Sequence, residues 1–257
     1  METNGIDIHY YRTGNPDGVT LVLAHGLYDD GRCFAPTMAE FTDQFDVIAI
    51  DARGHGLSDA PSIGYTIDDR VADLAGLLDE LSIDSPILWG HSMVGNTVAC
   101  LAATYPTLPR TLVLEDPAGM LHGIHERASE ERIFNVRELI ESWHNQSCTA
   151  LLESFEHEAW KEYLFHARRR VSTDVTEIFR NGYRRPSTTF SKITCPTLIL
   201  RADVDDDQRA LDRERVDRFD DARLEHVTNA GHCIRRDEFG TTVHLIRQFL
   251  SDSVETE

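Results

Sequence analysis

The chain has 257 residues, 41% of them hydrophobic, which is enough for one domain with a substantial core. Its formal net charge of −19 argues against a protein that binds nucleic acid through a basic surface. It has no apolar run of the roughly 18 residues that a membrane span requires, and residues 1–5 lack the features of a secretory signal.

Strands and helices are predicted to alternate along the chain. Residues 6–12 form an early strand, and residues 34–43 form a helix. Thr66 is expected to cap a helix that runs to about Leu81, because Asp69 follows three places later and apolar side chains recur on one face. This alternation predicts an α/β fold, with a mostly parallel sheet and helices on both of its faces.

The second half of the chain continues this pattern after an interruption. Between Pro117 and about Ile193 the sequence predicts long, charged helices and no strand. We therefore expect a core formed by residues 1–116 and 194–257, with a helical insertion at 117–193. The remaining expected elements are a helix from the serine motif described next to about residue 105, strands at 110–114 and 197–200, and a C-terminal helix at 238–250.

The most informative stretch is Gly-His-Ser-Met-Val-Gly at residues 90–95, directly after the apolar run 87–89. A serine between small residues, at the junction of a strand and a helix, is typical of a nucleophile elbow. The pattern G-x-S-x-G is imperfect here, because Val94 stands at the second glycine position and Gly95 follows it. Since β-branched residues resist positive φ, Val94 requires a slightly open turn or a negative φ.

Three more motifs lie at predicted strand ends: His-Gly at 25–26, Asp-Ala-Arg-Gly-His-Gly-Leu-Ser at 51–58, and Ala-Gly-His at 230–232. In this order and at these separations, the four motifs resemble those of the α/β-hydrolase superfamily over nearly the whole chain. The resemblance implies the α/β-hydrolase fold and a Ser-His-acid triad in the chain order nucleophile, acid, histidine. It also implies that the insertion is a cap over the nucleophile.

The resemblance assigns roles to particular residues. Ser92 is the expected nucleophile, against the alternative that it only caps a helix, and His232 is the expected general base. The backbone N–H groups of Leu27 and Met93 are the expected oxyanion hole. His25, His55, His91 and Arg53 match positions that hold the loops around the site.

The acid of the triad is left open by the sequence. Asp205 stands at the usual position of the family, after the strand 197–200, but it lies in a run of aspartates that is also typical of a solvated loop. Glu115 ends the strand 110–114, where some family branches carry their acid, and a buried carboxylate there requires a partner. Asp116, followed by Pro117, is the third candidate and is more typical of a structural turn.

A serine nucleophile points to acyl chemistry on small carboxylic esters or lactones through an acyl-enzyme. Haloalkane dehalogenases and epoxide hydrolases of this fold use an aspartate at the elbow, so both are disfavoured. Two alternatives remain: a carbon–carbon bond hydrolase or acyltransferase of the same fold, and a non-enzymatic ligand-binding protein, which Val94 alone favours. The insertion's arginines (168–170, 180, 184–185) are expected to be solvated or paired, with binding of a substrate carboxylate as the alternative.

Two features of composition concern the environment of the protein. Only Lys161 and Lys192 are lysines among 25 basic residues, and acidic, lysine-poor chains are typical of salt-accumulating microbes, although an acidic mesophilic protein is the alternative. The odd number of cysteines, without C-x-x-C spacing, predicts reduced thiols in the cytoplasm and no cysteine-based metal site. No cofactor is expected, the partner is a small-molecule substrate, and the oligomeric state is not indicated. The five cysteines are Cys33, Cys100, Cys148, Cys195 and Cys233.

Overall fold

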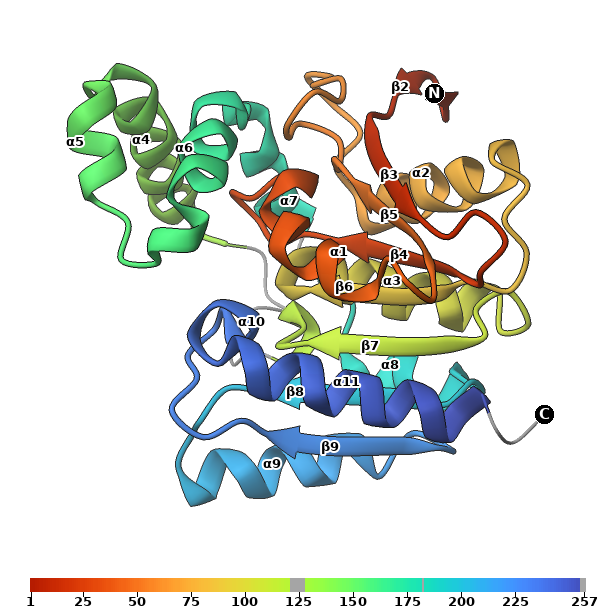
Figure 1. The fold of residues 1–257 in the computed structure, drawn as a ribbon. Coiled ribbons are helices and arrows are strands. Elements are labelled where there is room, and N and C mark those ends of the chain that lie inside the picture. The colour runs from red at the N-terminus through yellow and green to blue at the C-terminus, as the bar shows by residue number, and fades with distance from the viewer. Residues whose placement is uncertain (121–127, 182, 255–257) are drawn as a thin grey trace.

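A computed structural model of the chain describes residues 1–120, 128–181 and 183–254. Its centre is a seven-stranded sheet in the order β3-β5-β4-β6-β7-β8-β9, in which β3 is antiparallel to its neighbour and the other strands are parallel (Figure 1). The strands are β3 (Tyr10–Gly14), β4 (Thr20–Ala24), β5 (Asp46–Ile50), β6 (Ile87–His91), β7 (Thr111–Glu115), β8 (Thr197–Arg201) and β9 (Ala222–His226). The predicted α/β architecture is confirmed.

Helices cover both faces of the sheet because alternate strand residues point to opposite sides. In β4, Val22 joins the apolar cluster of α2, α3 and α9, while Leu21 and Leu23 join that of α1 and α11. The helices of the core are α1 (Ala35–Phe41), α2 (Ile67–Glu80), α3 (Ser92–Thr104), α9 (Asp206–Val216), α10 (Ile234–Asp237) and α11 (Phe239–Val254). The strands between them carry apolar side chains on both faces, as expected for a buried parallel sheet.

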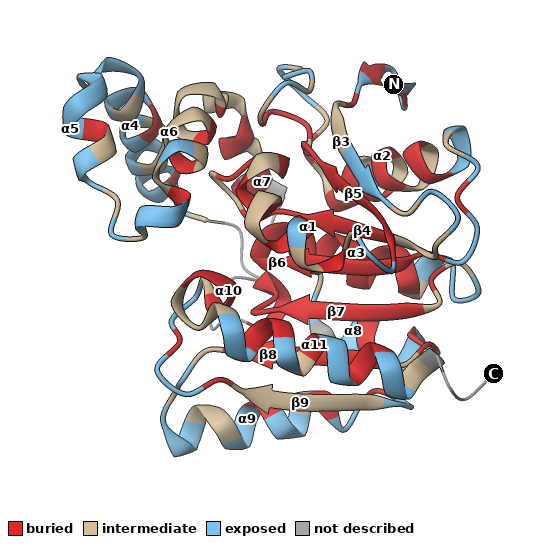
Figure 2. Ribbon diagram, viewed as in Figure 1, coloured by how far each residue is buried: buried red, intermediate tan, exposed pale blue. Residues whose placement is uncertain are grey.

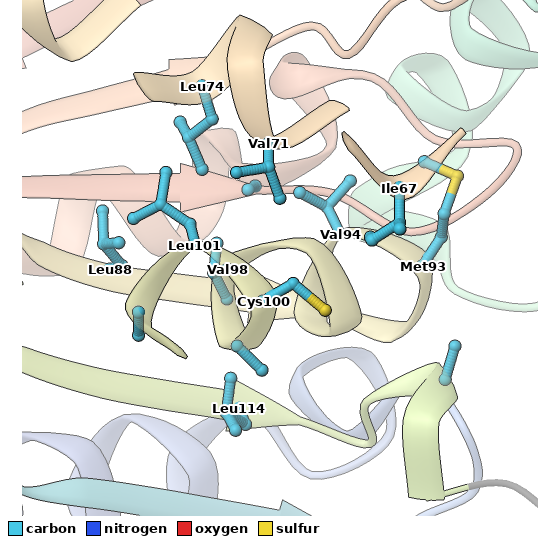
Figure 3. Close-up of a cluster of buried hydrophobic side chains, with 14 of the residues drawn as sticks. Ile67, Val71, Leu74, Leu88, Met93, Val94, Val98, Cys100, Leu101 and Leu114 are labelled. Atoms are coloured by element: carbon cyan, nitrogen blue, oxygen red, sulfur yellow. The ribbon is translucent and has the colours of Figure 1, made fainter. Parts of the chain in front are cut away.

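The contact between α2 and α3 fixes the helix that begins at Ser92. In Figure 3, Val71 and Leu74 of α2 point toward α3, whose Val94 and Leu101 point back. As predicted, Thr66 caps α2: its side chain accepts a hydrogen bond from Asp69 N–H, and the Asp69 carboxylate accepts one from Thr66 N–H. This capping box satisfies backbone donors that the first helical turn otherwise leaves unpaired.

The expected single strand at 6–12 is wrong in detail. The chain forms a two-stranded sheet, β1 (Glu2–Thr3) with β2 (Ile6–Asp7), and enters the main sheet only at Tyr10. The backbone N–H of Asp7 donates to the Asp59 carboxylate at 2.9 Å, and the N–H of His9 donates to Ser58 Oγ at 2.8 Å. Asp59 and Ser58 thus accept hydrogen bonds from backbone N–H groups that would pair with a neighbouring strand if residues 6–12 formed one continuous strand.

Between β7 and β8 the described residues form helices and no strand. Figure 1 shows α4, α5 and α6 standing beyond the carboxyl ends of the central strands, and Figure 2 shows α4 and α5 mostly exposed while β6 and β7 are buried. No helix within the described ranges has the length and apolar character to cross a membrane. The inserted helices are α4 (Glu130–Asn145), α5 (Cys148–Glu153), α6 (Lys161–Arg170), α7 (Glu177–Asn181) and α8 (Pro186–Thr189).

Candidate active site

Ser92 lies at a sharp turn between β6 and α3. Its φ of +50° is in the left-handed region, which a non-glycine residue enters at a cost of about 1 kcal/mol or more. Packing holds Ser92 in this conformation. The end of β6 and the start of α3 approach so closely that a Cβ on Gly90 would lie 2.8 Å from the Cα of Gly95. Val94 therefore causes no conflict: the positive φ falls on Ser92, Val94 lies inside α3, and the close approach to the strand is made by Gly95.

The structure brings Ser92 and His232 together, although 140 residues separate them. His232 follows β9, and its Nε2 lies 2.8 Å from Ser92 Oγ. Its Nδ1 lies 2.5 Å from Oδ2 of Asp116. A carboxylate only accepts hydrogen bonds, so Nδ1 carries the proton and Nε2 is free to accept the proton of Ser92.

Asp116 directly follows β7 and turns toward His232. Its φ is +41°, a region in which aspartate is more frequent than most residues, and its N–H donates to Leu200 O at 2.8 Å. The Arg201 guanidinium donates to its second oxygen. Burial raises the pKa of Asp116, but the hydrogen bond from His232 and the charge of Arg201 outweigh burial and hold it below its ordinary value.

The expectation that Asp205 or Glu115 faces the histidine is wrong. Asp205 is the N-cap of α9, and its side chain accepts a hydrogen bond from Gln208 N–H at 2.8 Å. Glu115 is fully buried, and its oxygens accept from Trp89 Nε1 at 3.1 Å and from Arg235 Nη1 at 3.0 Å, whereas Nδ1 of His232 bonds to Asp116. The partner that this buried carboxylate requires is thus a guanidinium rather than an imidazolium.

Two further histidines hold the loops around Ser92. His25 Nε2 accepts a hydrogen bond from Ala52 N–H at 3.0 Å, and its Nδ1 donates to Gly26 O at 2.7 Å, so it joins the loops after β4 and β5. His91 Nε2 donates to the carbonyl oxygen of His232 at 2.9 Å. Burial lowers the pKa of His25 and lowers that of His91 to about 3, so both rings are neutral.

The loop after β4 passes directly beside the elbow. Gly26 allows this, because a Cβ there would lie 2.6 Å from Nδ1 of His91 and 3.3 Å from Cβ of Ser92. The loop then turns sharply: Asp29 N–H donates to Gly26 O at 3.2 Å, and Tyr28 has a φ of +77°. Backbone groups of this loop therefore lie close to the nucleophile position, and Leu27 lines the cavity in front of it.

That cavity has a volume of about 260 Å³ and lies between the core and the inserted helices. The core contributes Ser92 and His232, whereas α4, α6 and α7 contribute Val136, Arg168 and Phe179. Among the residues that the structure describes, no three His, Cys, Asp or Glu side chains are grouped so as to hold a metal ion.

Comparison with known sequences identifies the family. A family model described as "Alpha/beta hydrolase family" matches residues 21–239. The chain belongs to this family. The mostly parallel sheet with helices on both faces is thus an alpha/beta hydrolase fold.

Individual relatives of this hydrolase differ in name and in coverage. It is 40% identical over 99 residues to a 2-(acetamidomethylene)succinate hydrolase of Mesorhizobium japonicum, a match that spans 38% of the chain and 36% of that protein. It is 28% identical, over 90% of both chains, to a putative 2-succinyl-6-hydroxy-2,4-cyclohexadiene-1-carboxylate synthase of Bacillus subtilis. The enol-lactonase structure from Burkholderia xenovorans LB400 superposes with a TM-score of 0.77 at 22% identity, covering 97% of this chain and 98% of that one, which shows the shared fold.

Proposed function

We propose that this hydrolase cleaves small carboxylic esters or lactones through an acyl-enzyme on Ser92. The observation that carries the proposal is the line of two hydrogen bonds from Ser92 Oγ through His232 to Asp116, of 2.8 and 2.5 Å. A serine hydroxyl is a poor nucleophile unless a base takes its proton during attack, and His232 Nε2 has the position and the free lone pair for that role.

In the proposed mechanism, Ser92 Oγ attacks the carbonyl carbon while its proton passes to His232 Nε2. Asp116 stabilises the imidazolium that forms and keeps the ring in the tautomer with the proton on Nδ1. His232 then gives the proton to the leaving alcohol oxygen, and the acyl-enzyme remains. In the second half, His232 takes a proton from a water molecule that attacks the acyl carbon, and then gives that proton to Ser92 Oγ as the bond from Oγ to the acyl carbon breaks. The carboxylic acid leaves and the serine hydroxyl is restored.

The backbone N–H groups of Leu27 and Met93 would stabilise the oxyanion that forms during attack. Met93 is the second residue of α3, so its N–H has no acceptor one helical turn earlier. Leu27 lies on the loop that Gly26 allows beside Ser92. Loss of one such donor typically costs about 100- to 1000-fold in rate.

The insertion at 117–193 would act as the cap of this site. Its helices supply part of the cavity wall, and the cavity of about 260 Å³ lies below the range of roughly 300–1000 Å³ typical for drug-sized ligands. Esters and lactones of short acyl groups are therefore the expected substrates. In this proposal the core consists of residues 1–116 and 194–257, on either side of the cap.

The test is hydrolysis of p-nitrophenyl acetate and butanoate in molar KCl by the wild type and by Ser92→Ala. Activity in the wild type that is lost in the variant is the expected result. Labelling with a fluorophosphonate, followed by mass spectrometry, should place the adduct on the peptide that contains Ser92. Equal activity of the two proteins, or an adduct elsewhere, would refute the assignment of the nucleophile.

A second candidate is carbon–carbon bond cleavage or acyl transfer at the same serine. It is favoured by the relative from Bacillus subtilis, which covers 90% of both chains and carries the name of a synthase rather than a hydrolase. A screen of dicarbonyl compounds and acyl donors, with Ser92→Ala as the control, separates it from ester hydrolysis. Turnover of a dicarbonyl compound without ester hydrolysis would favour this candidate.

A further inference from the structure

The cavity in front of Ser92 has a charge opposite to that of the whole protein. Among the residues that the structure describes, the charged side chains that line it are three arginines and one aspartate, Arg132, Arg168, Arg236 and Asp29, on a chain with a formal net charge of −19. A positive cavity on a strongly negative protein concentrates small anions at one place. A guanidinium in this cavity is available to a ligand only if the protein's own carboxylates do not already bind it.

Two of the three are held by the protein itself. Arg236 Nη2 donates to Asp29 Oδ2, and Arg168 Nη1 donates to the carbonyl oxygen of Tyr28 and lies 3.4 Å from Asp29 Oδ1. Arg235, behind them, also donates to Asp29 at 3.2 Å. Burial raises the pKa of Asp29, but the three guanidiniums outweigh burial and hold it far below its ordinary value. Arg235 is also paired with Glu115, so three guanidiniums share two carboxylates and this wall keeps a positive charge.

Arg132 is different, because it has no carboxylate partner within the described ranges. It lies in the first turn of α4, and its Cζ is 5.3 Å from the ring centroid of Phe179, which also lines the cavity. Stacking on a ring orients a guanidinium and leaves the N–H donors at its edge free. Arg132 is therefore an oriented cation at the cavity wall opposite the core, with no carboxylate among the described residues to neutralise it.

Two tyrosines on the same cavity add neutral hydrogen-bond donors. Tyr28 and Tyr183 line the cavity with Arg132, and the charge of Arg132 acts on both phenols. Burial raises the pKa of both hydroxyls and outweighs the neighbouring arginines, so both stay protonated near pH 7. Guanidinium and phenol donors that line one cavity suit a ligand with acceptor oxygens.

We propose that this cavity takes acyl compounds that carry a free carboxylate a few bonds from the scissile carbonyl, and that Arg132 binds this carboxylate. The proposal rests on the proposed function, since it places the scissile carbonyl at Ser92. A cavity of about 260 Å³ leaves room for a short chain only, so the half-esters and related lactones of four- or five-carbon dicarboxylic acids are the matching class. A guanidinium binds a carboxylate bidentately, which also fixes the direction of the chain.

The kinetic test compares monoethyl succinate with ethyl levulinate, in which an acetyl group replaces the carboxylate. We expect the wild type to favour the succinate ester in kcat/KM, and Arg132→Ala to reduce this preference by about 10- to 100-fold, as expected for a hydrogen-bonded charge. Arg137→Ala is the matched control: it removes the same charge from the same helix, and Arg137 does not line the cavity. Its preference should equal that of the wild type.

Three results would overturn the proposal: a wild type without preference, an Arg132→Ala variant that keeps it or loses both activities equally, and an Arg137→Ala variant as impaired as Arg132→Ala. Binding separates this proposal from the proposed function. Calorimetry should show that the Ser92→Ala variant binds succinate. A double variant that carries both Ser92→Ala and Arg132→Ala should not bind it. Succinate binding without turnover of either ester would refute the proposed function alone. Turnover without preference or succinate binding would refute the carboxylate site alone.

Discussion

Replacement of Asp116 by asparagine tests the geometry of the site most directly. The amide side chain has nearly the same shape as the carboxylate, and its oxygen would still accept from Arg201, which also keeps its 2.8 Å contact from Nε to Asp212 Oδ2. The amide N–H₂ would then face His232 Nδ1, at present 2.5 Å from the carboxylate. This forces the proton to Nε2, where His232 no longer accepts the proton of Ser92.

The expected loss of kcat follows from removal of the negative charge of Asp116. Two unit charges about 4 Å apart attract by about 4 kcal/mol at an effective dielectric constant of about 20. In the proposed mechanism the imidazolium forms during attack, so this loss falls on the barrier and corresponds to about a 1000-fold lower kcat. KM should change little, because the substrate does not touch the carboxylate.

The assay is ester hydrolysis by purified Asp116→Asn, with circular dichroism to confirm the fold. Asp205→Ala is the control, because it removes the N-cap of α9 at a cost of about 1 kcal/mol in stability and should leave kcat unchanged. A folded Asp116→Asn enzyme with a kcat within about tenfold of the wild type would refute the reasoning. So would an equal loss of kcat in Asp205→Ala.

Three other predictions concern stability. Molar KCl should raise the melting temperature above its value in 0.1 M KCl, because the self-repulsion of a chain with net charge −19 is screened when the Debye length falls to about 3 Å; an unchanged or lower melting temperature would contradict a salt-adapted surface. Acid should destabilise the fold through three buried histidines whose pKa values burial lowers, namely His25, His55 and His91. Below the unfolded-state pKa near 6.5 the unfolded chain binds these protons more strongly than the folded chain does, so the free energy of unfolding falls as pH falls. Asp30, whose pKa is raised to about 7 chiefly by burial, opposes this change by one proton, so the fall in stability is smaller than the three histidines alone would cause. Urea unfolding at pH 5.0 and 7.5 measures this change in the free energy of unfolding, and equal values at the two pH values would contradict the prediction. Gly90→Ala should unfold or inactivate the protein, because its Cβ would lie 2.6 Å from a side-chain atom and 2.8 Å from a backbone atom of α3, whereas Gly240→Ala, with no atom within 4 Å, should be tolerated in thermal unfolding.

The sequence by itself determined the architecture and two members of the site. Alternating apolar strands and amphipathic helices leave few packings other than a parallel sheet covered on both faces. The carboxyl ends of parallel strands lie along one edge, so motifs that end β6 and follow β9 meet there. This is why Ser92 and His232 were predictable as neighbours although 140 residues separate them.

Only the tertiary structure decided which carboxylate meets the histidine. Successive side chains at a strand end point to opposite sides, so Glu115 and Asp116 face different surroundings, and the sequence does not specify the strand end to one residue. The positive φ of Asp116 then turns its carboxylate to His232. The tertiary structure also decided the position of Arg132. Its helix is predictable from the charged, periodic sequence, but its place on the cavity wall depends on how the inserted helices pack against the core. That packing involves contacts between residues far apart in the chain.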